Sequence, residues 1–337
     1  MAVQGAYGYV VARLRAMEHR FLDASFINKL VESDDVQSSL KLLGDTIYGQ
    51  FLSSQRSDRF DEALESALLD SYLEVRGFVP DVALVDVNRL YYDIHNVKVV
   101  VKSAILSKRG GKKRWDLMTS LGSVPVDDLL EAVESDDYRM LPLGLGEVIQ
   151  GCFAVFEQTG DPMDVESLLD RYYFQILEEV VKETSLAGLS DWVKEKVDGE
   201  NLRTLFRLKR MGFDSQMVLP FLYPGGKLDR SDLISLLSEP VSAWSRVLYC
   251  TSFSQLFSAI GDQMSLEEAM PLLEKALDDH FSAYWNRYRY VIDAPENVLA
   301  FLWGKEMEVK NVRMILVSKA TNYDKERVRR LLRHGYP

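Results

Sequence analysis

Apolar residues recur three and four positions apart over three long stretches, residues 58–74, 161–183 and 265–287. None of these stretches has a glycine in its interior. Residues with this spacing lie on one face of an α-helix, so the pattern predicts three helices that each bury one face. Ser57 or Asp58 is expected to cap the first helix and Ser265 the third, where Glu267 and Glu268 also suit the positive helix end.

Two short motifs recur at a spacing of about a hundred residues. The first is Val-Glu-Ser-Asp-Asp, found at Val31–Asp35 and Val133–Asp137, with a degenerate copy at Leu237–Val241. The second is an apolar pair, an aspartate and, two residues later, an aromatic or histidine side chain. It occurs at Leu68–Tyr72, Leu168–Tyr172 and Ala276–His280. Because the two motifs alternate in one order three times, the chain is predicted to contain three copies of one unit.

A third motif matches most sharply, and we call it the asparagine landmark. Its eight positions hold, in order, an acidic residue, two residues of any kind, an asparagine, an aliphatic residue, a base, one residue of any kind and an aliphatic residue. It occurs at Asp93–Val100, Asp198–Leu205 and Glu308–Ile315. Taken alone, the β-branched valines within residues 97–102 favour a strand. In all three copies, however, apolar residues follow the asparagine after one, four and five positions, which is helical spacing. We therefore predict three helices.

The predicted fold is all-α, with three similar helical-bundle units at residues 1–112, 113–220 and 221–337. Glycine-rich turn sequences at Arg109–Lys113 and Pro224–Gly226 lie near the two unit boundaries. If the units pack around a pseudo-threefold axis, equivalent residues lie at equivalent radii and can line a common socket. An open solenoid adaptor is the alternative, although solenoid repeats are shorter, about 20 to 47 residues.

The net charge of −11 argues against affinity for nucleic acid or anionic lipid, because both require clustered lysine and arginine. No secretory signal is expected at the start of the sequence. The most apolar window, residues 140–156, is interrupted by proline and glycine and is shorter than the ~20 residues of a membrane span. Cys152 and Cys250 are expected to be buried thiols in a reducing compartment.

Nothing in the sequence has the spacing of a cofactor or metal site. The Gly-Lys sequences at 110–113 and 225–228 lack the phosphate-loop frame, and residues 144–146 lack the third glycine of a dinucleotide site. No two histidines have the spacing that would place both on one metal ion. The acidic pairs at 34–35 and 136–137 are expected to lie in loops or helix caps, since they lack the pattern of a calcium loop.

His95 is the one histidine inside an asparagine landmark. Its counterparts are Glu200 and Lys310, so a shared general base is not indicated, and a variable helix surface is expected. The sequence thus predicts neither catalytic residues nor cofactors. A helical enzyme with a site between units is a third interpretation, which a cluster of titratable groups in one cleft would support.

Each landmark places an asparagine beside a base. The candidate partner-binding residues are Asn96, Lys98, Asn201, Arg203, Asn311 and Arg313. In a structural interpretation, the amides form hydrogen bonds between helices and the cations are solvated or pair with acids on a neighbouring helix. In a functional interpretation, the pairs line a central socket that grips one asymmetric partner.

The landmarks and two further segments resemble the C subunit of the archaeal and bacterial V-type (A-type) rotary ATPases, a relative of the eukaryotic d subunit. The resemblance covers nearly the whole chain and is carried by Tyr7–Arg15, Asp45–Gly49, Tyr92–Asn96, Val197–Arg203 and Lys305–Arg313. The third copy departs from the first two at Glu308 and Lys310.

The resemblance implies a funnel of three helical units and a protein with no catalytic site. Such a protein occurs once per complex, sits on the cytoplasmic face of the membrane rotor ring (c/K) and receives the D and F subunits of the central stalk. It implies torque transfer between stalk and ring in a proton- or sodium-translocating motor. Attachment to the membrane is then expected to be peripheral, through the proteins of the ring and without direct lipid binding.

Overall fold

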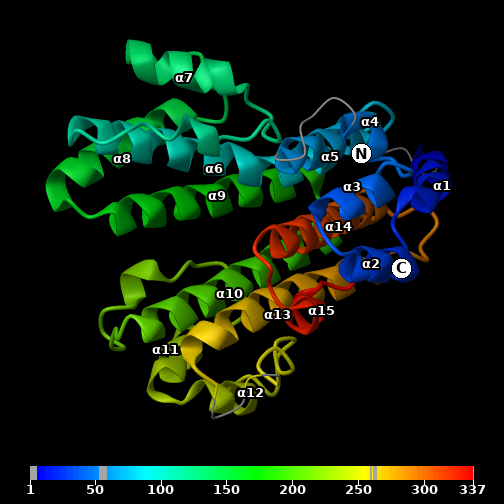
Figure 1. Cartoon of the computed structure of the whole chain (residues 1–337). Coiled ribbons are helices and arrows are strands. Elements are labelled where there is room, and N and C mark those ends of the chain that lie inside the picture. Colours follow the sequence, from blue (N-terminus) through cyan, green and yellow to red (C-terminus); the bar gives the residue numbers. More distant parts are fainter. Residues whose placement is uncertain (1–5, 53–58, 259, 261–263, 337) are drawn as a thin grey trace. The chain divides into compact units, whose positions relative to one another are not determined.

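The computed structural model describes residues 6–52, 59–258, 260 and 264–336, and it shows an all-helical chain (Figure 1). These residues form α-helices and short 3-10 helices and contain no strand, as predicted. They divide into two compact units, Leu68–Leu186 and the combination of Met1–Ala67 with Ala187–Pro337. The division into three units with boundaries near 112 and 220 stays a prediction.

The smaller unit is a bundle around α6 (Ala83–Lys108), with the last part of α5 (Phe60–Arg76) at its start. α7 (Val126–Ser135), α8 (Leu145–Thr159) and α9 (Pro162–Thr184) all pack against α6. α8 and α9 also pack against each other. The smaller unit therefore has a long central helix that holds the first asparagine landmark.

The larger unit is organised around α14 (Glu296–Ala320), most of whose 25 residues are buried. A helix that is buried on several sides lies inside a core rather than at a surface. The remaining helices are α1 (Ala6–Met17), α2 (Ala24–Glu32), α3 (Val36–Leu43), α4 (Gly49–Leu52), α10 (Ala187–Arg210), α11 (Arg230–Ser238), α12 (Trp244–Val247), α13 (Leu266–Asn286) and α15 (Lys325–Leu331). α1, α2, α3, α13 and α15 pack against α14.

The three periodic stretches are helices, confirmed as α5, α9 and α13. Ser265 caps α13 through a reciprocal pair of hydrogen bonds with Glu268, as its position predicted. The proposed caps Ser57 and Asp58 lie outside the described residues. Asp35 caps α3 by accepting a hydrogen bond from the Ser38 N–H, which confirms the helix-cap interpretation of the first acidic pair.

The asparagine landmarks are helical in all three copies, on α6, α10 and α14. The nine apolar side chains that follow the asparagines are all 0% exposed: Val97, Val100, Val101, Leu202, Leu205, Phe206, Val312, Ile315 and Leu316. Complete burial of such a side chain stabilises the fold by roughly 1.5–3 kcal/mol. This exceeds the small helix-propensity penalty of valine, so packing makes residues 97–102 helical.

The prediction of two buried thiols is right for Cys152 and wrong for Cys250. Cys152 is buried within α8, and this burial raises its pKa to about 12. Cys250 is exposed because it lies in a turn that follows α12 rather than on a packed helix face. Among the described residues, no helix combines the length and the apolar character that a membrane span requires.

Candidate functional site: three asparagine clasps

Each landmark asparagine is buried and holds the backbone of a segment that follows its helix. The amide Nδ2 of Asn96 donates to the Thr119 carbonyl at 2.8 Å, and Oδ1 accepts from the Thr119 N–H at 2.9 Å. Asn201 binds Tyr223 in the same way, at 2.9 and 2.7 Å. A side-chain amide carries a donor and an acceptor side by side, as this pairing requires. We call each arrangement an asparagine clasp.

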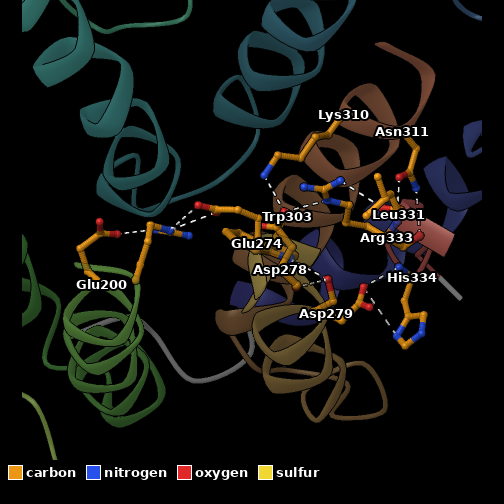
Figure 2. Close-up of polar contacts among 12 residues, drawn as sticks. Glu200, Glu274, Asp278, Asp279, Trp303, Lys310, Asn311, Leu331, Arg333 and His334 are labelled. Carbon is orange, nitrogen blue, oxygen red and sulfur yellow. Dashed lines mark hydrogen bonds and ion pairs between the residues drawn. The ribbon is translucent and has the colours of Figure 1, made fainter. Parts of the chain in front are cut away.

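The third clasp joins Asn311 to Arg333, again through both backbone groups, at 3.0 and 2.8 Å (Figure 2). The clasped residue lies 22 or 23 positions after the asparagine in every copy. The asparagines are at most 3% exposed. The repeat therefore specifies one local geometry three times.

An acidic side chain one helical turn before the asparagine holds a second point on the same segment. Asp93 accepts from the Val124 N–H at 2.9 Å and from the Ser123 hydroxyl at 2.6 Å. Asp198 accepts from the backbone N–H of Lys227 at 2.7 Å and of Leu228 at 3.1 Å. Residues three apart share a helix face, so the acid and the asparagine grip the segment together.

The third acid, Glu308, binds a segment from the other end of the sequence. It accepts from the Leu22 N–H, from the Tyr48 hydroxyl at 2.7 Å and from the Lys305 ammonium at 2.9 Å. α2 begins two residues after Leu22, just as α7 and α11 begin two residues after the corresponding donors of the first two copies. The first part of the sequence thus completes the third copy, with α2 in the place of α7 and α11.

Two lysines confirm this correspondence. Lys209 and Lys319 each lie eight residues after a landmark asparagine. Lys209 donates to the Leu237 carbonyl at 2.6 Å and Lys319 to the Val31 carbonyl at 3.0 Å, and both acceptors begin a copy of the Val-Glu-Ser-Asp-Asp motif. The lysines satisfy carbonyl groups at the ends of α11 and α2. Sequence reasoning missed them, although their shared spacing was a usable signal; Ala104 stands at this position in the first copy.

Glycine is required where the clasped segment passes the acid. A Cβ atom on Gly122 would overlap the Asp93 carboxylate, and one on Gly226 would overlap the Asp198 carboxylate. Both glycines lie three residues after a clasped residue. The close approach leaves the backbone N–H groups within hydrogen-bond distance of the acid.

Phe21 and Tyr336 stack beside the third clasp, with ring centroids 4.5 Å apart and an angle of 15° between the planes. The Lys305 ammonium lies 3.9 Å from the centre of the Phe21 ring, and the Tyr336 hydroxyl donates to Glu18 at 3.2 Å. The segments before α2 and after α15 are therefore held against each other as well as against α14.

The three landmark bases pair with acids on neighbouring helices. The pairs are Lys98 with Asp170, Arg203 with Glu274 and Arg313 with Asp61. The three cations are therefore paired within the chain rather than only solvated. The amides bind backbone groups outside the α-helices rather than a second helix, which differs from the expected hydrogen bonds between helices. Partner contact by the six residues stays a prediction, and the burial of the asparagines favours a structural role for these three.

Burial shifts the pKa values of the clasp acids. Loss of hydration raises the pKa of Asp198 to about 6, against the opposing effect of the two backbone N–H donors. It also raises the pKa of Asp93.

Asp278 lies between Lys310 and Arg333, at 2.6 and 2.9 Å (Figure 2). Burial opposes its ionisation, but these two cations outweigh that effect and lower its pKa.

His95 lies partly exposed on α6, and its Nε2 atom is 2.9 Å from the Leu117 carbonyl. The side chain thus contacts the short 3-10 helix Trp115–Leu117 that follows α6. Across the part of the chain that the structure describes, histidine, cysteine and acidic side chains form no cluster with the geometry of a metal site.

Comparison with known proteins gives matches over nearly the whole chain. The family described as ATP synthase (C/AC39) subunit matches residues 10–331. The C subunit of the A-type ATP synthase of Methanocaldococcus jannaschii is 25% identical, over 97% of this chain and 86% of the relative. The C subunit of the V-type sodium ATPase of Enterococcus hirae is 21% identical, over 96% and 97%. The C subunit of the A-type ATP synthase of Haloferax volcanii is 23% identical, over 95% of each chain.

Proposed function

Because the chain belongs to the ATP synthase (C/AC39) subunit family, we propose that it is the non-catalytic central-stalk component of a proton- or sodium-translocating rotary ATPase. In this role it is a socket or spacer that joins the D and F subunits of the shaft to the membrane rotor ring (c/K). It turns with them and transmits torque. Membership of the family removes the alternative of an unrelated solenoid adaptor.

The three clasps are the observation that carries this proposal. α6, α10 and α14 are 24 to 26 residues long, which corresponds to about 36–39 Å. Connecting segments are ordinarily the most mobile parts of a protein. Here α6 and α10 each hold the following segment at two points, through an asparagine and an acid. α14 holds the following segment through Asn311 and the segment before α2 through Glu308. A stiff body of this kind transmits force with little deformation.

The chemistry of the landmarks supports a positioning role rather than catalysis. The asparagine amides bind backbone groups, and the acids accept hydrogen bonds from backbone N–H groups. Groups that are buried and already hydrogen-bonded stabilise one conformation and are not exposed to a substrate.

Attachment to the membrane is proposed to be peripheral, on the cytoplasmic face and through the proteins of the ring. The purified chain should therefore remain in solution when it is mixed with protein-free liposomes. Tight binding to such liposomes would contradict this part of the proposal.

Co-purification tests the assignment to the central stalk. The tagged chain is expressed in its source cell, and the membrane fraction is solubilised with a mild detergent. We expect the D and F subunits and the ring protein to elute with the chain, with one copy of the chain per complex. Elution of the chain without any other part of an ATPase would refute the proposed function.

A further inference from the structure

The ends of the three long helices form equivalent segments with an unusual composition. We define each helix tip as the sixteen residues that begin six positions after the landmark asparagine, which gives residues 102–117, 207–222 and 317–332. Each tip contains the end of a long helix and most of the segment that precedes the clasped residue.

The helix tips are basic in an acidic chain. They make up about one seventh of the sequence, yet they hold 14 of its 40 lysines and arginines and only four of its 51 aspartates and glutamates. The negative end of a helix favours cations in its last turn. This explains Lys108, Arg210 and Arg330, which lie in the last turns of α6, α10 and α15. It does not explain Lys112, which lies beyond the end of α6, or Lys325, which begins α15. The excess of positive charge therefore exceeds what helix ends require.

The helix tips also expose large apolar side chains. Among the described residues, seventeen large apolar side chains are exposed. Seven of them lie in the helix tips: Leu106, Leu117, Met211, Met217, Leu219, Val317 and Tyr323. Their exposed fractions range from 41% to 55%. Single exposed apolar residues are ordinary, but their repetition on equivalent segments is not.

Each tip has at least one exposed cation that forms no ion pair with the described residues of the chain. Lys112, Arg210 and Arg330 have neither a hydrogen bond nor an ion pair with any residue that the structure describes. Other tip cations are paired, such as Arg329 with Glu32. The unpaired cations make little contribution to the fold and are available to a partner.

We propose that the helix tips are docking surfaces for acidic protein surfaces of neighbouring components of the complex, an inference that rests on the proposed function. The partner of each tip carries carboxylates opposite the unpaired cation and apolar side chains opposite the exposed ones. Charge complementarity argues for this occupant, because the remainder of the chain is strongly acidic and would repel an acidic partner. Docking is thereby directed to the tips.

The composition of the tips favours a protein over a lipid surface. Methionine, tyrosine and arginine are enriched in protein interfaces. Binding to a lipid surface requires an amphipathic helix with a broad apolar face, or a basic cluster on such a helix or beside a membrane span. α15, the helix within the third tip, has only seven residues. The tips therefore fit a partner protein of complementary charge.

The test compares two triple variants with the same change in net charge. The tip variant carries Lys112→Gln, Arg210→Gln and Arg330→Gln. The control variant carries Lys41→Gln, Lys182→Gln and Arg230→Gln, at positions that are likewise exposed and have no ion pair among the described residues. Both variants should melt within about 2 °C of the wild-type chain, since exposed unpaired charges contribute little to stability.

Each tagged variant is expressed in the source cell, and the complex is isolated through another of its proteins. Retention of the chain is measured as salt rises from about 50 to about 500 mM, which screens surface charges. We expect the tip variant to dissociate at lower salt, with an affinity about tenfold weaker at low salt, while the control behaves as wild type. Equal retention of both variants would overturn the proposal.

Two further outcomes separate the possible failures. If the wild-type chain is absent from the complex, the proposed function fails and not merely the assignment of the tips. The purified chain is also mixed with vesicles of neutral phosphatidylcholine and with vesicles that contain anionic phosphatidylglycerol. Binding to the anionic vesicles that the tip variant loses would make a membrane the occupant and overturn the proposal.

Discussion

Replacing Asn201 with alanine removes both hydrogen bonds of the second clasp. The side chain is 1% exposed, and its bonds to the Tyr223 N–H and carbonyl are 2.7 and 2.9 Å long. Alanine removes one hydrogen bond from each of these two buried backbone groups, at about 1–3 kcal/mol each. We expect a loss of roughly 2–5 kcal/mol, a large part of the 5–15 kcal/mol that stabilises a typical domain. The loss corresponds to about 5–15 °C in Tm.

Two further substitutions sharpen this prediction. Asn201→Asp retains the acceptor but loses the donor while its carboxyl is ionised, and a protonated carboxyl regains a donor. The stability of this variant should therefore approach that of the wild type as the pH falls. Asn28, which is exposed on α2, provides a control, and Asn28→Ala should stay within about 0.5 kcal/mol of the wild type.

The assay combines urea denaturation with hydrogen exchange. Stability is taken from the urea midpoint, and exchange is followed in the peptide that contains residues 221–230. Asn201→Ala should accelerate exchange in this peptide more than elsewhere. Stability within 1 kcal/mol of the wild type, with unchanged exchange there, would refute the clasp. If stability is retained but binding to the stalk falls, the socket interpretation of the asparagine is correct instead.

Three further predictions concern the other parts of the clasps. Gly226→Ala should lower the free energy of unfolding, measured with urea, by more than about 2 kcal/mol because the new Cβ atom overlaps Asp198. Gly8→Ala is the control: its Cβ atom meets no atom within 4 Å, so this change should be neutral or stabilising. Burial raises the pKa of Asp198 to about 6, above its usual 3.8, so its protonated form stabilises the fold below about pH 4. About 3 kcal/mol of this stability is lost as the pH rises through 6. Urea midpoints should show this slope, and Asp198→Asn should abolish it. Removing residues 333–337 deletes the partner of Asn311 and the ring that stacks on Phe21. The free energy of unfolding should therefore fall by about 3–5 kcal/mol, and the amide hydrogens of residues 21–32 should exchange faster. Unchanged exchange at those residues would contradict the third clasp.

The helices were predictable because their signals are local. Apolar spacing after Asn96, Asn201 and Asn311 identified all three landmark helices, including one whose valines alone favour a strand. The burial of these side chains shows why: the spacing defines a face, and the core covers that face. Ser265 was equally readable, since a cap depends on residues within one turn.

The clasps were not predictable from one copy of the repeat. The landmarks drew attention to the asparagines, but their bonds reach segments about 22 residues away. The completion of the third copy depends on a contact between Leu22 and Glu308, which are 286 residues apart. No periodic pattern encodes such a contact. The exposure of Cys250 was missed for a related reason, because composition alone cannot place a residue in a turn.

The ratio of ions transported to ATP hydrolysed tests the central claim most directly. The complex is isolated from source cells with and without the chain, reconstituted into vesicles, and supplied with ATP. A torque-transmitting spacer predicts that hydrolysis continues without the chain, that ion transport ceases, and that adding the purified chain restores it. Ion transport at the wild-type ratio in the absence of the chain would contradict the account.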